Sequence, residues 1–148
     1  LRALFLRFGE SNGIPAQELE RREREEDFLP TTVLARIGWL DIALRSNHIL
    51  EQVAATNCCN EFSNQLTGGR FFRAFNRHYG LSSNDIEFFA EHGEADTEHS
   101  NIGYELVEQF ATTNELQVRV LKALRKGLSI WWALTDGVAR ECARINME

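Results

Sequence analysis

Residues 92–99, which read HGEADTEH, are the most informative stretch of this sequence. They place His92, Asp96 and His99 four and then three residues apart, the spacing of side chains that share one face of an α-helix. At about 100° per residue these side chains point within ~40° of one direction, so two imidazoles and a carboxylate can converge on one ion. The stretch therefore predicts a helix that carries a candidate metal site.

Apolar residues continue the same helical spacing on both sides of this polar motif. They are Phe88, Ala95, Ile102, Leu106 and Phe110. A helix face that is apolar at its ends and polar in its middle must find partners for the polar groups, because burying an unpaired charge or imidazole is costly. A metal ion would satisfy all three groups. The alternative interpretation is a solvated polar face, since glutamates are interspersed with the motif.

The rest of the chain has a period near 3.6 and almost no period of 2, which predicts an all-α fold. We expect helices over residues 1–10, 15–27, 31–46, 49–66, 70–79, 82–110 and 112–142. Gly68-Gly69 should bend or interrupt the chain. Ser82 with Asp85 fits a capping box at the start of the motif helix, and Thr112 with Glu115 repeats that pattern before the last helix.

Composition narrows the class of protein. A chain of 148 residues with 43% hydrophobic and 26% charged residues suits one helical domain over residues 1–148. The net charge of -6 argues against nucleic acid as a partner. The longest apolar run, residues 128–134, is far shorter than the ~20 residues that span a bilayer. Three cysteines suit a reducing compartment, so we expect a cytoplasmic protein.

A second helix must supply further ligands, and Glu61 is the best candidate. It continues the apolar stripe of Leu50, Ala54 and Cys58, which predicts a carboxylate that faces the core. The alternative is an exposed glutamate beside Asn60. Imidazoles and carboxylates without a thiolate suit iron or manganese, with zinc possible, and an acidic residue three before a histidine is typical of carboxylate di-metal bundles.

These residues together resemble the haem-oxygenase-like di-iron oxidase and oxygenase superfamily, which includes pyrroloquinoline quinone synthase and thiaminase II. The resemblance runs from LFLRF at residues 4–8 to WWALTDGV at residues 131–138, through RHYG at 77–80. It implies a haem-oxygenase-like helical bundle in which Glu61, His92, Asp96 and His99 match metal ligands. It also implies two irons that bind and reduce O2 to oxidise a small organic substrate, namely an amino acid, an amine or a fatty acid.

The family's remaining glutamate and histidine come from a helix that precedes the segment resembling residues 4–8. We therefore expect this chain to lack the N-terminal helices of the bundle and to hold about half of the two-iron site. Exposed apolar surface should then favour a homodimer. Two other interpretations stay open: a thiaminase-like hydrolase that uses Cys58 or Cys59, and a non-catalytic helical interaction module.

Overall fold

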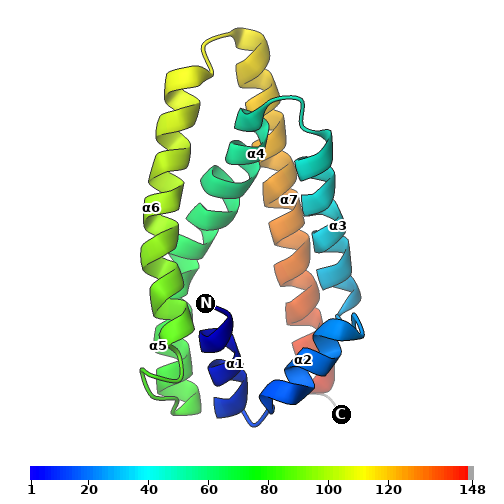
Figure 1. Cartoon of the computed structure of the whole chain (residues 1–148), viewed down its shortest axis with the longest axis vertical. Coiled ribbons are helices and arrows are strands. Elements are labelled where there is room, and N and C mark those ends of the chain that lie inside the picture. The colour runs from blue at the N-terminus through cyan, green and yellow to red at the C-terminus, as the bar shows by residue number, and fades with distance from the viewer. Residues whose placement is uncertain (147–148) are drawn as a thin grey trace. The chain divides into compact units, whose positions relative to one another are not determined.

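The computed structural model describes residues 1–146, and every regular element in this range is a helix (Figure 1). The elements are α1 (Arg2–Ser11), α2 (Ala16–Arg24), α3 (Pro30–Arg45), α4 (Ile49–Ala55), a π-helical segment η1 (Thr56–Glu61), α5 (Phe62–Tyr79), α6 (Glu87–Phe110) and α7 (Asn114–Ile145). The all-α prediction is confirmed. Within the same range, no helix is both long and apolar enough to cross a membrane.

The paired glycines Gly68 and Gly69 do not interrupt the chain, so this expectation was wrong. Helix α5 runs through both of them from Phe62 to Tyr79. A Cβ atom on Gly68 would lie 3.5 Å from the Cα atom of Gly93 in α6, which is an ordinary van der Waals distance. The low helix propensity of the two glycines therefore does not end α5 here.

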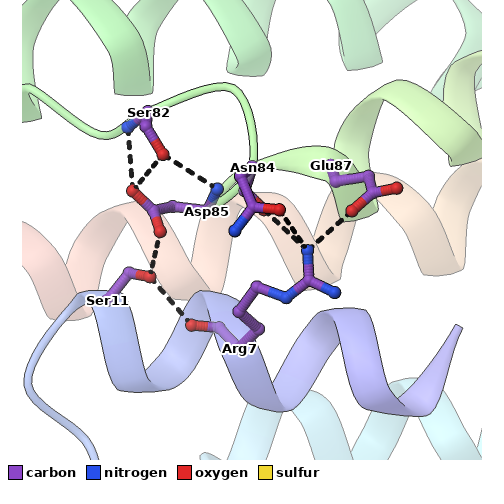
Figure 2. A network of polar contacts seen from close by, with 6 residues as sticks. All are labelled: Arg7, Ser11, Ser82, Asn84, Asp85 and Glu87. Carbon is purple, nitrogen blue, oxygen red and sulfur yellow. Dashed lines mark hydrogen bonds and ion pairs between the residues drawn. The ribbon is translucent and has the colours of Figure 1, made fainter.

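The capping box at Ser82 forms, but it closes a turn that precedes the motif helix. The Ser82 amide donates to Asp85 Oδ2 at 2.9 Å, and the Asp85 amide donates to Ser82 Oγ at 3.3 Å (Figure 2). Helix α6 itself begins at Glu87. Ser11 Oγ donates to the second carboxylate oxygen of Asp85 at 2.9 Å, so the turn also anchors α1.

The N-cap of the last helix lies one residue after the predicted one. The Leu116 amide donates to Thr113 Oγ1 at 3.2 Å, so Thr113 and not Thr112 is the N-cap of α7. Residue 111 explains the shift, because the Ala111 amide still bonds to Val107 at the end of α6 while its carbonyl accepts from Gln117. Thr112 is therefore held in the connecting turn.

Substituting Asp85 with asparagine should destabilise the protein at neutral pH and much less in acid. Hydrogen bonds from Ser82, and then from Ser11, lower the pKa of Asp85. A lowered folded-state pKa means that the carboxylate stabilises the fold above its unfolded pKa and that this contribution is lost as pH falls through the folded value. Thermal unfolding of both proteins from pH 7 to pH 2.5 tests this, with Ser83→Ala in the same turn as control. A difference that stays constant in acid would contradict it.

The chain divides into two compact units, each of which we describe by itself. One comprises Leu1–Phe28 and Phe62–Glu98, and the other comprises Leu29–Glu61 and His99–Glu148. In the first unit Phe8 makes edge-on contacts with Phe75 and Phe89, at ring-centroid distances of 5.0 and 4.9 Å. In the second, buried residues from α4, from α7 and from the turn between α6 and α7 form a cluster of Leu50, Ala54, Ala111 and Val120. The assignment of one domain stays a prediction.

Candidate metal centre

The π-helical segment η1 positions the first candidate ligand. It occupies Thr56–Glu61 between α4 and α5 and ends at Glu61. A π-turn holds one more residue than an α-turn, so it rotates the residues that follow it relative to a regular helix, and such segments occur often at functional sites. The stripe of Leu50, Ala54 and Cys58 is buried as predicted. The spacing of these residues does not predict the π-turn.

Two glycines allow neighbouring helices to touch this segment closely. A Cβ atom on Gly103 of α6 would lie 2.4 Å from Asn57 Cβ, and one on Gly127 of α7 would lie 2.9 Å from the Ala55 carbonyl oxygen. Neither position tolerates a side chain without movement of its neighbour. Sequence reasoning missed both glycines as positioning residues, because a glycine within a helical pattern looks the same whether or not it is packed.

Hydrogen bonds add to this close packing around η1. Asn57 Nδ2 donates to the His99 carbonyl oxygen at 3.1 Å, and the Tyr104 hydroxyl donates to the Cys58 carbonyl oxygen at 3.2 Å. The second bond satisfies a backbone carbonyl in a segment where helical hydrogen bonding is irregular. These contacts set the register of Glu61 against His99.

Glu61 and His99 lie close together in the second compact unit. Glu61 Oε2 is 3.8 Å from His99 Nδ1, which is longer than the usual limit of about 3.2 Å for a hydrogen bond. Glu61 is half-buried, whereas the His99 side chain is 54% exposed. The pair therefore presents an oxygen and a nitrogen donor to the same space without a direct bond between them.

Asp96 lies one helical turn before His99 on the unbroken helix α6. It is buried, with 3% of its surface exposed, and its Oδ2 atom has no hydrogen-bond partner among the described residues. One ligand atom from each of Glu61, Asp96 and His99 lies within 4.8 Å of the other two. A buried carboxylate oxygen without a partner is costly, and a cation would remove that cost.

The donor set fits iron. Two carboxylates and one imidazole, with no thiolate, suit iron or manganese. An ion about 2.1 Å from each donor holds those donors about 3 to 3.4 Å apart, so the side chains would close slightly around it. The structure thus brings together three of the four predicted ligands.

His92 is not in this group. Its side chain is half-buried, its Nδ1 atom lies 3.1 Å from the Phe88 carbonyl oxygen, and its ring packs on that of Phe88 at 4.2 Å between centroids. The bond to the carbonyl one turn earlier draws the ring toward the start of α6. A bond from Nδ1 to a backbone carbonyl is common in metal-binding histidines because it leaves Nε2 to bind the ion. The role of His92 as a ligand stays a prediction.

The thiols beside the site are poorly suited to act as nucleophiles. Cys58 and Cys59 are 6% and 1% exposed. Burial raises the pKa of Cys59 to about 11 and also raises that of Cys58. Because the thiolate is the reactive form, these surroundings favour inert, packed cysteines over a catalytic thiol.

Comparison with known proteins adds to this geometry. A family model described as "Iron-containing redox enzyme" matches residues 2–132. A 4-aminobenzoate synthase from Nitrosomonas europaea is 36% identical over 74 residues, which are 49% of this chain and 30% of that protein. The aligned segment thus covers less than a third of the relative's length. No solved structure gives a significant match.

Proposed function

This chain belongs to the iron-containing redox enzyme family, and we propose that it acts as a non-haem di-iron oxidase or oxygenase that oxidises a small organic substrate with O2. The resemblance of the sequence to the haem-oxygenase-like superfamily is confirmed at the level of this family. The observation that carries the proposal is the buried Oδ2 of Asp96, which has no hydrogen-bond partner in the described part of the chain and lies one turn from the Glu61–His99 pair.

We propose that Glu61, Asp96 and His99 hold iron, and that His92 and further residues complete the site. Iron, when bound, supplies the binding and reduction of O2. The carboxylates of Glu61 and Asp96 offset the charge of a ferrous ion, and a neutral His99 imidazole adds a donor without changing that balance. Burial of Asp96 makes its interaction with a cation stronger than it would be in water.

The test is iron uptake by the chain itself. Purified protein is reconstituted anaerobically with ferrous iron, desalted and analysed for metal, and O2 consumption is then measured on exposure to air. We expect retained iron and O2 uptake, both strongly reduced in His99→Ala. Equal, background-level iron in both proteins would reject the proposal and leave a non-catalytic helical module as the interpretation. Parallel loading with manganese and zinc identifies the preferred metal.

A further inference from the structure

Helix α3 is apolar on nearly every side. Its sequence, PTTVLARIGWLDIALR, has three charged residues among 16. A helix that is apolar all round is normally buried, because each apolar face needs a partner. One face of α3 has such a partner in α7, alongside which it runs in the second compact unit (Figure 1). On this face Ala35 and Ile42 are buried, and a Cβ atom on Gly38 would lie 2.8 Å from Ile130 Cδ1.

The opposite face of α3 carries an apolar stripe that the described residues leave uncovered. We call it the α3 stripe, and it consists of Val33, Ile37, Leu40 and Leu44. The exposed fractions of these residues run from 38% at Val33 to 81% at Leu44. At about 100° per residue, the four side chains point within about 60° of one another and roughly 180° away from the residues buried against α7. The stripe therefore lacks the partner that its composition requires.

The spacing of the α3 stripe is that of a coiled-coil seam. Its successive members lie four, three and four residues apart, which is the a and d pattern of a heptad. In this register Ile37 and Leu44 occupy a positions, and Val33 and Leu40 occupy d positions. A β-branched residue at a with leucine at d, as in Ile37 with Leu40, favours two parallel strands. Because each side chain of such a seam fits between residues of an identical helix, the occupant that suits the stripe is a second copy of this chain.

The exposed apolar surface is large enough for a specific interface of modest strength. Leu34, which occupies the e position beside the α3 stripe, is 68% exposed and widens the apolar surface. Covering Leu34 and the stripe on both copies would remove on the order of 1,000 Å2 from water, the lower limit for a specific interface. We therefore expect a dimer that dissociates on dilution.

We propose that two copies of this chain associate in parallel along the α3 stripe, with the two-fold axis between the paired helices. Each residue of the stripe then packs against the same residue of the other copy. The contact of α3 with α7 is unchanged, so each α3 is covered on both of its apolar faces. The inference gives the predicted homodimer a surface. It uses no residue of the candidate metal centre and does not depend on bound iron.

Sedimentation velocity over a wide range of protein concentration tests the association. Physiological salt screens the repulsion between two copies of net charge -6. We expect the parent protein to show a monomer–dimer equilibrium. Leu44→Lys should weaken the dimer at least about 100-fold, because two unpaired charges would be buried, at about tenfold each. Leu44 is 81% exposed, so this change leaves the monomer folded, and Val118→Lys, at a 65% exposed site on α7, is the matched control.

Cysteine cross-linking tests the location and direction of the pairing. Val33→Cys and Leu44→Cys are made separately with the exposed Cys142 changed to serine, oxidised mildly and separated by non-reducing electrophoresis. Parallel pairing places each new thiol opposite its own copy, so each variant alone should form a disulfide-linked dimer. Cross-linking that occurs only when the two variants are mixed would show antiparallel pairing and overturn the proposal. A monomer at every concentration would also overturn it, as would equal effects of Leu44→Lys and Val118→Lys.

Discussion

Replacing Asp96 with asparagine should abolish iron binding without destabilising the iron-free protein. The carboxylate is buried, and one of its oxygens has no hydrogen-bond partner within residues 1–146, so in the iron-free protein its charge costs free energy that asparagine does not incur. With iron, the same carboxylate is a ligand. Loss of a residue that supports a ligand costs 10- to 100-fold in metal affinity, so loss of a ligand itself should cost at least about 100-fold.

The measurement is thermal or chemical unfolding with and without ferrous iron, together with metal analysis. At free iron of 100 times Kd, the metal should stabilise the parent protein by about 2.7 kcal/mol, and Asp96→Asn should lose this increment. Glu98→Gln, an exposed site on the same helix, is the matched control. An Asp96→Asn protein that keeps its iron would contradict the assignment, and so would one that unfolds much more easily without metal.

Replacing Gly127 with alanine should destabilise the protein although alanine favours helices. The new Cβ atom would lie 2.9 Å from the Ala55 carbonyl oxygen and 3.2 Å from Ala55 Cα, which are backbone atoms that cannot rotate away. Overpacking of this kind costs about 1–3 kcal/mol. At roughly 2–4 °C per kcal/mol for a chain of this size, the unfolding temperature should fall by several degrees.

Gly93→Ala is the matched control for this substitution. Gly93 also lies within a helix, but a Cβ atom there would meet nothing within 4 Å. This change should raise stability by about 0.5–1 kcal/mol through helix propensity alone. Because η1 contains Glu61, Gly127→Ala should also weaken iron retention, whereas Gly93→Ala should not. Equal shifts in the two variants would show that contact between α7 and the backbone at Ala55 does not position η1.

Local patterns in the sequence determined the helices and the chemistry of the site. Three features depend only on residues that are close together in the sequence. They are the 3.6-residue period, the Ser82–Asp85 hydrogen bonds, and the placement of Asp96 one turn before His99 on the same helix. The burial of Leu50, Ala54 and Cys58 also followed from their spacing, and the same spacing predicted a core-facing carboxylate at Glu61.

Contacts between residues distant in sequence decided the rest. The π-helical segment that ends at Glu61 is packed by Gly103 and Gly127, which are distant in sequence, so this feature cannot be read from its own segment. His92 bonds to the Phe88 carbonyl and lies outside the group of three, although its spacing equals that of a ligand. The sequence by itself determined which donors exist and on which helices. Only tertiary packing decided which of them meet, because helix spacing sets direction along one helix and not the distance to the next.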